Sequence, residues 1–507
     1  MKKTVLVIGL LAALKLVLPF LLQHPAYELH RDEYLYYEQG QHLALGYLEN
    51  PPLIGLLAYL SSLFGGTPFW IKFWPALFGG FTLVVTAGIA RELGGKRWAP
   101  VIAASAILLT AFLRIHILFQ PNFLDIFFWT LSAYYLVRYI NTQQPLYLYL
   151  LSTALALGWW SKYSVLFFIT AIVVSLLATP HRKLVQQKHF WGAVGWGMLL
   201  IAPNVWWQYQ HNWPLAHHMD ELRETQLRHL HADDFIKEQL LYLLPFLPVW
   251  LGGLVWLFRH HAFRIIAYMY LCVIVLLMIG SGKGYYALGT YPMLLAAGGV
   301  WLESVRLRRW RYAVVAWILV LSLPFIPLLL PMQAPQPMAA FNQKYGIEKL
   351  GLLKWEDQQN HPLQQDFADM QGWKELTQKS EAFFNNLPNA ERVQTIVFCR
   401  HYGQAASLKY HAQSAFFRSK VMTDNGTFLL WIPDHLIFKN LLFIGRRMPD
   451  KDDAVFQHFQ NVTVIDSVTN PLSRQYGDKI IYFQQADAEA IRLANEGLQQ
   501  MKQQFRR

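Results

Sequence analysis

The chain has 507 residues, of which 54% are hydrophobic and only 15% are charged, and its formal net charge is +12. Soluble globular proteins carry about 25% charged residues, so this composition excludes an ordinary soluble protein. It also argues against a nucleic-acid partner, because the lysines and arginines lie in short loops between long apolar runs, as they do in membrane proteins.

The first apolar run, 4–22, follows two lysines and is predicted to be an uncleaved first membrane span, because no small-residue cleavage site follows it. Further runs of about spanning length continue to residue 331. They lie at about 68–90, 98–115, 122–140, 145–159, 163–179, 190–207, 239–258, 263–280, 284–303 and 311–331. We therefore expect a mainly α-helical, polytopic membrane bundle of about 11 spans over residues 1–335. The shorter run 51–64 predicts a helix that lies in the membrane interface.

The lysines and arginines of the short loops predict the orientation of the bundle. With the N-terminus in the cytoplasm, most of the inside loops are markedly basic, whereas the outside segments are mixed or acidic. An odd number of spans then places the C-terminal part outside. We expect a multi-pass protein of the inner (plasma) membrane with a periplasmic, extracytoplasmic C-terminal domain.

The first outside loop, 30–55, contains the adjacent acids Asp32 and Glu33 and the aromatic residues Tyr36 and Tyr37. A carboxylate at the membrane surface among aromatic side chains is partly desolvated, which raises its basicity and suits a general base. The two tyrosines are candidates for lining a substrate site. The alternative is that the acids only cap the helix that follows.

A third acid, Asp125, begins a predicted span among aromatic residues. An ionisable residue in a span is costly and therefore usually functional, although an aspartate also favours the start of a helix. The predicted orientation, which does not depend on the acids, places Asp125 on the same side as Asp32 and Glu33.

Two lysines, Lys162 in LGWWSKYSVL and Lys283 in GSGKGYYALGTYP, are predicted at that same level of the membrane. Such lysines either extend to the lipid headgroups or form a cationic cradle for a lipid phosphate. Tyr285 and Tyr286 follow Lys283 and are candidates for stacking on a sugar or lining an isoprenoid groove.

The outside loop 208–238 is rich in histidine, with His211, His217, His218, His229 and His231. The HHMDE and HLHADD patterns are compatible with Zn²⁺ binding, whereas histidine-rich polar loops are more often simply solvated. A divalent metal therefore stays an open alternative, and no metal ligand or other cofactor is assigned.

The C-terminal part, 340–507, alternates polar stretches with short β-rich runs, which predicts a small soluble α/β domain. The expected strands are 395–399, 427–433, 440–445, 461–466 and 479–485. A helix at about 486–504 closes the chain, and residues 331–338 are the expected linker to the bundle.

These motifs together resemble the GT-C glycosyltransferases: the first-loop acids, the PPL-led interfacial helix, the aspartate that opens the fourth span, and the lysine–tyrosine turns at 162–163 and 283–286. The most similar groups are bacterial relatives of the dolichyl-phosphate-mannose protein mannosyltransferases and the lipid A aminoarabinose transferase. The likeness covers about 25–305. In the tail, ADMQGWKEL (368–376) and CRHYGQAASLKYH (399–411) resemble signatures that follow the spans in some bacterial members.

The resemblance implies that a first-loop acid is the catalytic base, and Asp32 matches it best, with Glu33 as the rival. It further implies that Asp125 helps to build the same site and that Lys162 and Lys283 lie near the donor phosphate.

Two positions depart from the family pattern. Asn50 stands where members often have a basic residue, and Lys72 stands where they often have arginine. These departures leave the identity of the sugar open.

The function implied by the resemblance is the transfer of a sugar from a polyprenyl-phosphate-linked donor to a lipid, glycan or protein acceptor, by an inverting single displacement on the outer side of the membrane. The donor, the acceptor and membrane lipids are then the partners. A transporter or flippase of a lipid-linked sugar is the main alternative, although such proteins place charges near the bilayer midplane and often show repeats. A non-catalytic assembly subunit would not need acids and cations gathered on one side.

Overall fold

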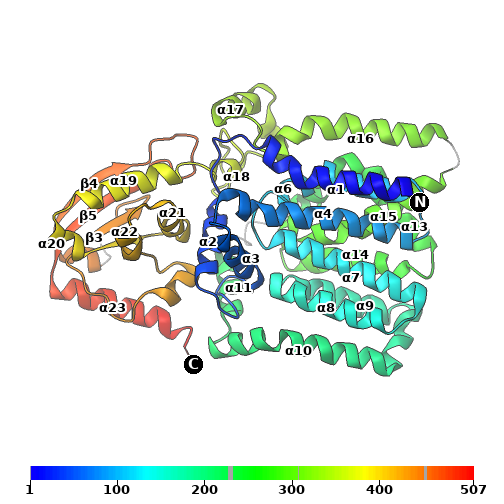
Figure 1. The fold of residues 1–507 in the computed structure, drawn as a ribbon, viewed down its shortest axis with the longest axis horizontal. Helices are drawn as coiled ribbons and strands as arrows, with labels where there is room; N and C mark the ends of the chain where they lie inside the picture. Colours follow the sequence, from blue (N-terminus) through cyan, green and yellow to red (C-terminus); the bar gives the residue numbers. More distant parts are fainter. Residues whose placement is uncertain (1, 226–231, 306–307, 450–453, 507) are drawn as a thin grey trace.

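The computed structural model of the chain describes residues 2–225, 232–305, 308–449 and 454–506. Figure 1 shows a bundle of helices beside a smaller part that contains a β-sheet, and the two parts meet at α2, α3 and α11. The helices of the bundle are α1 (Lys2–Leu22), α2 (Arg31–Gln41), α3 (Leu53–Leu63), α4 (Pro68–Glu92), α5 (Ala99–Leu109), α6 (Phe112–Ile115), α7 (Asn122–Thr142), α8 (Leu146–Ser161), α9 (Val165–Leu177), α10 (Lys188–Gln210), α11 (Pro214–Thr225), α12 (Ala232–Tyr242), α13 (Leu247–Arg259), α14 (Arg264–Ile279), α15 (Tyr291–Ser304) and α16 (Arg308–Leu329), with 3₁₀ turns η1 (Pro180–Gln186), η3 (Leu244–Phe246) and η4 (Gly284–Thr290).

Among the described residues, three helices are long and apolar enough to cross a membrane, Lys2–Leu22, Pro68–Glu92 and Arg309–Leu329, and up to five spans result if each of two bent pairs counts as one. The expected count of about 11 spans is thus not confirmed. Several predicted spans are shorter helices: α5 has 11 residues, and α8 and α14 have 16 each. A helix of 16 residues is about 24 Å long, which is less than the hydrocarbon thickness of about 30 Å.

The centre of the bundle is packed through small residues on α15, which is buried along almost its whole length. A Cβ atom at Gly298 would collide with the carbonyl of Val249 on α13, and one at Gly299 would collide with the carbonyl of Ala99 on α5. Small residues of this kind allow helix backbones to approach closely, which is how helices associate in membranes.

The smaller part contains a five-stranded sheet in the order β2-β1-β3-β5-β4. Strand β1 pairs in parallel with β2 and β3, and β5 pairs antiparallel with β3 and β4. Its elements are α17 (Pro335–Lys344), η5 (Ile347–Leu350), α18 (Gln365–Ala368), α19 (Trp373–Asn386), α20 (Asn389–Val393), β1 (Thr395–Cys399), α21 (Tyr402–His411), α22 (Ala415–Lys420), β2 (Val421–Met422), η6 (Gly426–Trp431), β3 (Asn440–Gly445), η7 (Ala454–His458), β4 (Phe459–Ser467), β5 (Lys479–Ala486) and α23 (Ala488–Gln503). An α/β domain was expected from the alternation of strands and helices, and the sheet agrees with it.

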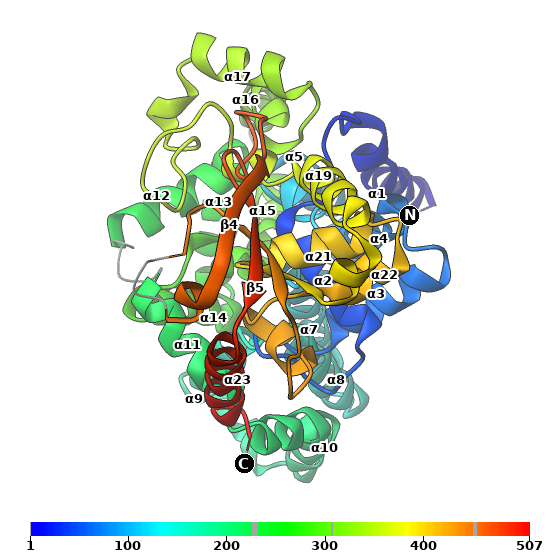
Figure 2. The same cartoon turned by 90° about the vertical axis from the view of Figure 1, so that its left-hand side faces the viewer.

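The two faces of the sheet are covered by different helices, as Figure 2 shows. Alternate strand residues point to opposite faces. Val397 and Leu442 belong to one hydrophobic cluster with residues of α19, α21 and α22, whereas Ile396 and Leu441 belong to another with residues of α23.

Four of the five expected strands are present, but the expectation for 427–433 is wrong, because this run forms the 3₁₀ helix η6. The backbone N–H of Thr427 donates to Glu49 at 2.6 Å, and its hydroxyl also bonds that carboxylate. The segment is therefore tied to the bundle and not to the sheet. Helix α17 begins inside the expected linker and crosses the predicted boundary between 1–335 and 340–507, which stays a prediction.

A shared core joins the two parts around α2. Leu29 and Tyr34 from the bundle side lie in one buried cluster with Trp373 and Leu408 of the sheet-containing part. Ion pairs reinforce this contact, including one of 2.7 Å between Lys409 and Glu38 on α2. The start of α2 is consequently held between both parts.

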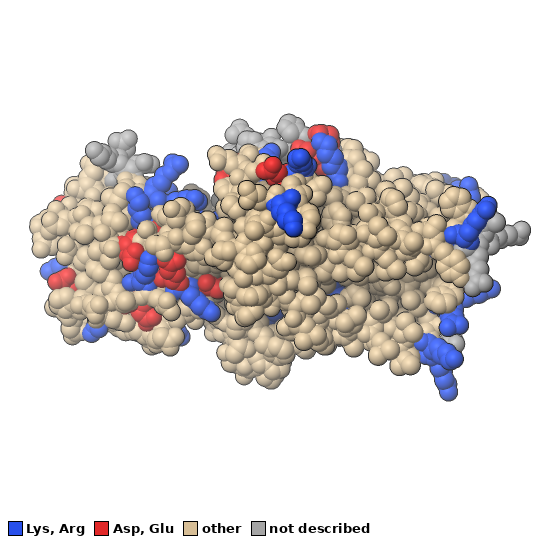
Figure 3. Space-filling model, turned by 90° about the horizontal axis from the view of Figure 1, so that it is seen from above, with Lys and Arg blue, Asp and Glu red and all other residues tan. Residues whose placement is uncertain are grey.

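Charged side chains are unevenly distributed over the face seen in Figure 3. Both signs occur on the sheet-containing part and at the middle of this face, mainly lysine and arginine occur at the far end of the bundle, and the band between the middle and the far end is nearly free of charge. A charge-free belt flanked by charged ends is what a multi-pass membrane protein requires.

Candidate functional site

The first turn of α2 carries the two first-loop acids, and the structure gives them different environments. His30 caps the helix: its Nδ1 accepts the backbone N–H of Asp32 at 3.1 Å, and Glu33 Oε2 accepts the backbone N–H of His30 at 2.7 Å. Of the two acids, Glu33 therefore has the helix-capping role that the sequence left open for the pair.

Glu33 is fully buried and fully bonded. Besides the cap, its carboxylate accepts the Lys72 ammonium at 3.0 and 3.1 Å and the backbone N–H of Phe119 at 2.8 Å. Lys72, one of the two departures from the family pattern, thus ties α4 to α2 and also donates to the Ile117 carbonyl at 3.2 Å. Its lone pairs are committed to four hydrogen bonds from three donor atoms, so Glu33 serves the fold.

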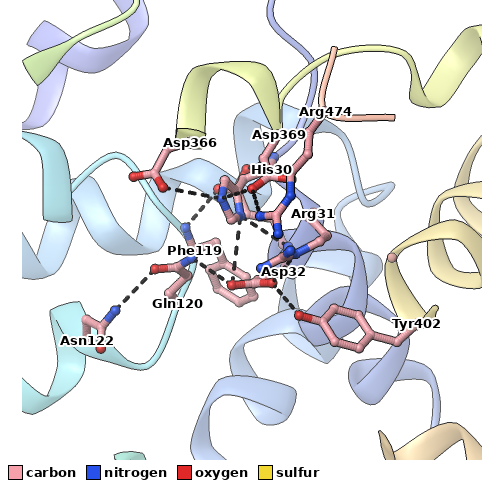
Figure 4. Close-up of polar contacts among 12 residues, drawn as sticks. His30, Arg31, Asp32, Phe119, Gln120, Asn122, Asp366, Asp369, Tyr402 and Arg474 are labelled. Carbon is pink, nitrogen blue, oxygen red and sulfur yellow. Dashed lines mark hydrogen bonds and ion pairs between the residues drawn. The ribbon is translucent and has the colours of Figure 1, made fainter. Parts of the chain in front are cut away.

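Asp32 keeps 20% of its side chain exposed. Its Oδ1 accepts the Tyr402 hydroxyl at 2.7 Å and Arg31 Nε at 3.2 Å, and its Oδ2 accepts Gln120 Nε2 at 3.0 Å (Figure 4). One lone pair of Oδ2 has no protein donor among the described residues, so this oxygen is the one that can still accept a proton or a substrate hydrogen bond.

The pKa of Asp32 lies below its ordinary value. Burial acts to raise this pKa, as expected from the sequence, but the charges of Arg31 and His30 and the hydrogen bond from Tyr402 outweigh it. The expected rise in basicity is therefore opposite to what the structure gives, because the sequence did not reveal the cations around the carboxylate. Asp32 is ionised throughout the physiological pH range.

Carboxylates from the sheet-containing part surround His30 on its other side (Figure 4). Its Nε2 lies 3.8 Å from both Asp366 and Asp369. Arg114 of the bundle donates to Asp366 at 2.8 Å, and Arg474 donates to Asp369 at 2.9 Å. Burial opposes a charged imidazole, but the nearby carboxylates of Asp366, Asp32 and Asp369 raise the pKa of His30 above its ordinary value.

Two amide side chains connect Asp32 to Lys162. Gln120 Oε1 accepts Asn122 Nδ2 at 3.1 Å, and Asn122 Oδ1 accepts the Lys162 ammonium at 2.6 Å. The ammonium also lies over the rings of Tyr286 and Tyr285, 4.2 and 5.2 Å from their centroids. The structure therefore brings the predicted lysine and both predicted tyrosines into one site with the acid.

Asp125 belongs to the Lys162 side of the site. It lies one helical turn after Asn122 on α7, is almost fully buried, and accepts the Ser164 hydroxyl at 2.8 Å. The negative charge of Asp125 acts on the Lys162 ammonium.

Lys283 precedes η4, whose first residue, Gly284, is held by Glu238 and Gln239 of α12 at 3.0 and 2.9 Å. The positive charge of Lys283 acts on both Lys162 and Glu356. Although burial alone would raise the pKa of Glu356, the charges of Arg474, Arg31 and Lys283 are among the causes that lower it.

The remaining predicted residues divide into two groups. Burial is the main cause that raises the pKa of Tyr36. Asp32 and Tyr402 lie close enough to its hydroxyl to add to this effect. Tyr37 packs edge-on against Tyr410, 5.1 Å between ring centroids, in the contact between the two parts. Adjacent residues on a helix point in different directions, so the structure joins only Tyr36 to the site.

The histidine-rich loop does not form a metal centre in the part that the structure describes, where no group of three His, Cys, Asp or Glu side chains is arranged to hold an ion. His211 stacks on Trp207 at 4.1 Å, and His217 lies edge-on to Phe505. His229 and His231 lie outside the described residues.

Sequence reasoning missed His30, Arg31, Gln120, Asn122 and Tyr402 as members of the site. Signals for some of them were present: Tyr402 lies in the second tail signature, Gln120 lies just before the fourth predicted span, and Asn122 is the first residue of that span. Their spatial meeting depends on contacts between distant segments, which spacing does not reveal.

Comparisons with known proteins show which sequences and folds the chain is similar to. Residues 49–207 match the dolichyl-phosphate-mannose-protein mannosyltransferase family. The lipid A galacturonosyltransferase RgtD of Rhizobium johnstonii is 24% identical over 196 residues, which are 38% of this chain, and the chain matches only 41% of the length of that relative.

Two solved structures share the fold. ArnT from Cupriavidus metallidurans, bound to undecaprenyl phosphate, superposes with a TM-score of 0.63 at 11% identity, over 94% of this chain and 97% of that one. The oligosaccharyltransferase of Archaeoglobus fulgidus, in complex with Zn and sulfate, gives a TM-score of 0.51 at 13% identity, over 86% and 67%. Together with the family match, these findings confirm the resemblance to GT-C glycosyltransferases.

Proposed function

We propose that this relative of the membrane glycosyltransferases moves a sugar from a polyprenyl-phosphate-linked donor to a lipid, glycan or protein acceptor, with inversion at the anomeric carbon. The observation that carries the proposal is the continuous connection from Asp32 through Gln120 and Asn122 to Lys162. It gives one site an ionised carboxylate at one end and a cation at the other. The undecaprenyl phosphate bound to ArnT, which shares the fold, supports the donor class.

The Lys162 end suits the leaving phosphate. An ammonium has three N–H donors, and Asn122 accepts one of them. The charge of Lys283 lies close by. Two cations placed where negative charge develops on the departing phosphate lower the barrier, because they are already oriented before the reaction. Tyr285 and Tyr286 hold the Lys162 ammonium over their rings and leave little room for it to turn away.

The Asp32 end suits the acceptor. A hydroxyl of the acceptor donates to Asp32 Oδ2, its oxygen attacks the anomeric carbon, and the bond from that carbon to the phosphate oxygen breaks. The electron pair of that bond leaves with the phosphate, and the hydroxyl proton passes to Asp32. Because the pKa of Asp32 is low, the carboxylate takes the proton late, as the attacking oxygen becomes acidic, and it is always in its active form.

We also propose that the site faces the outer side of the membrane. The N-terminus lies at the end of the bundle away from the sheet (Figure 1). Mainly lysine and arginine occur at that end on the face seen in Figure 3. The positive-inside rule then supports a cytoplasmic far end and an extracytoplasmic α/β domain.

Transfer is tested in membranes of a strain that lacks the gene, since these membranes supply the donor and the acceptor. The full-length protein is added back, and mass spectrometry follows the sugar-modified envelope product. Asp32→Asn should lower the rate by about 10²–10⁴-fold, the usual worth of a general base. Glu348→Gln, which removes an exposed carboxylate from η5, is the control and should stay near the wild-type rate.

A wild-type protein that forms no new covalent product but moves a lipid-linked sugar across the membrane would contradict the proposal and favour the transporter. Normal transfer by the Asp32→Asn variant would remove Asp32 from the chemistry.

A further inference from the structure

We propose that Tyr402, the first residue of α21 in the α/β domain, is a positioning residue that fixes the Asp32 carboxylate for catalysis. The inference rests on the proposed role of Asp32 and goes beyond it, because it makes the C-terminal domain part of the catalytic unit. Nothing in the sequence resemblance assigns a role to this tyrosine.

The contact geometry supports positioning. The Tyr402 hydroxyl donates to Asp32 Oδ1 at 2.7 Å, and Arg31, which donates to the same oxygen at 3.2 Å, lies over the Tyr402 ring at 5.9 Å. Two donors on Oδ1 and the single bond from Gln120 to Oδ2 stop the carboxylate from rotating. The free lone pair of Oδ2 is thereby kept in one direction, where an acceptor hydroxyl can meet it.

The fold holds Tyr402 in place through the cap of α21. His401 caps the helix with its Nδ1 accepting the Gly403 N–H at 3.0 Å, and Gln404 Oε1 accepts the His401 N–H at 3.1 Å. The backbone N–H of Tyr402 donates to Asn425 Oδ1 at 3.2 Å. A capping box fixes the backbone of the first turn, so the tyrosine enters the site from a rigid element.

Gly403 explains why α21 can come so close to α2. A Cβ atom at this position would stand 2.6 Å from Cγ of Arg31 and 3.2 Å from the Trp373 ring. Trp373 belongs to the other tail signature, and its Nε1 donates to the Asp369 carbonyl at 2.7 Å. Both signatures of the tail therefore converge on the residues around Asp32.

A second tyrosine on the same helix separates positioning from docking. Tyr410 donates to the Gly66 carbonyl at 2.9 Å and packs against Tyr34 and Tyr37, so it also joins the two parts. Each tyrosine makes one hydrogen bond across the contact, but only Tyr402 reaches Asp32. If Tyr402 only docks the domain, the two should behave alike.

The experiment compares Tyr402→Phe with Tyr410→Phe in the full-length protein, using the transfer assay in membranes of the deletion strain. Tyr402→Phe should lower the transfer rate about 10- to 100-fold, as expected for a lost hydrogen bond to a charged group that also orients it. The affinity of the purified variant for undecaprenyl phosphate should stay at the wild-type value. Tyr410→Phe should lower thermal stability as Tyr402→Phe does, while its transfer rate stays close to wild type.

A double-mutant cycle with Asp32→Asn gives a readout that a structural role would not change. If Tyr402 acts through Asp32, Tyr402→Phe should have no further effect on the residual rate of the Asp32→Asn protein. An equal loss in both backgrounds, or equal rates for Tyr402→Phe and Tyr410→Phe, would overturn the inference and leave the proposed function standing. A normal rate for Asp32→Asn itself would overturn both.

Discussion

The two ends of the candidate site are built differently. At the Asp32 end, the carboxylate is surrounded by ions and hydrogen-bond donors from both the bundle and the α/β domain, among them Arg31 and Tyr402. At the Lys162 end, the described residues that hold the cation all belong to the bundle, one amide and two aromatic rings. The difference suggests that the bundle binds the lipid-linked donor and that the α/β domain completes the acceptor side.

The comparison also separates two neighbouring acids. Asp32 keeps some exposure and a lone pair that no described residue bonds, whereas Glu33 is buried with every lone pair used. A fully bonded, buried carboxylate maintains structure, and a partly exposed one with a free lone pair is available for chemistry.

The largest expected effect is on stability at Glu33. Glu33→Gln would leave the Lys72 ammonium buried without a counter-charge, which should cost about 3–5 kcal/mol of unfolding free energy. Asp32→Asn should also lower stability, because Arg31 and His30 favour the ionised carboxylate. The loss should be smaller than in Glu33→Gln, since Asp32 is partly exposed and Glu33 is fully buried. Thermal unfolding of the purified variants measures both. Equal losses would show that the two acids share one structural role.

A smaller effect is expected in the support of the Asp32 end. Gln404, which caps α21, donates to Asp478 at 2.6 Å, and burial raises the pKa of Asp478 to about 6. Because the unfolded chain releases this proton near pH 4, the folded protein loses stability as pH rises from about 4 to 6. Asp478→Asn removes that loss. The variant should gain about 2–3 kcal/mol over wild type above pH 6, and the gain should vanish below about pH 4.

Unfolding curves of wild type and Asp478→Asn at several pH values measure this difference. A gain that is the same at all pH values would show that the pKa of Asp478 is the same in the folded and unfolded states, and the support of α21 would then be insensitive to pH.

Much of the site could be predicted from the sequence because its members carry unusual chemistry for their surroundings. Asp32 lies in the loop after the first apolar run, Asp125 lies near the start of another run, Lys162 lies between two runs, and each belongs to the candidate site. Regular strand patterns likewise predicted β1 and β3 with their observed bounds. Local sequence patterns are enough to predict a feature when a single segment of the chain determines it.

Other features depend on distant segments and were missed or wrong. The direction of the Asp32 pKa shift is set by His30, Arg31 and Tyr402, and the last of these is 370 positions away in the chain. The run 427–433 has a strand-like pattern, yet its contact with Glu49 takes it out of the sheet. The count of about 11 spans is not confirmed, because several apolar runs form helices shorter than a full membrane span.

The division of roles between the two ends is tested most directly by the affinity of purified full-length variants, in lipid nanodiscs, for undecaprenyl phosphate. Lys162→Ala should weaken binding about 10-fold through the loss of a charge-assisted phosphate contact. Asp32→Asn should bind as wild type does, and so should Lys183→Ala, which removes an exposed lysine from η1. Unchanged binding by Lys162→Ala, or a loss in Asp32→Asn as large as that in Lys162→Ala, would contradict the account.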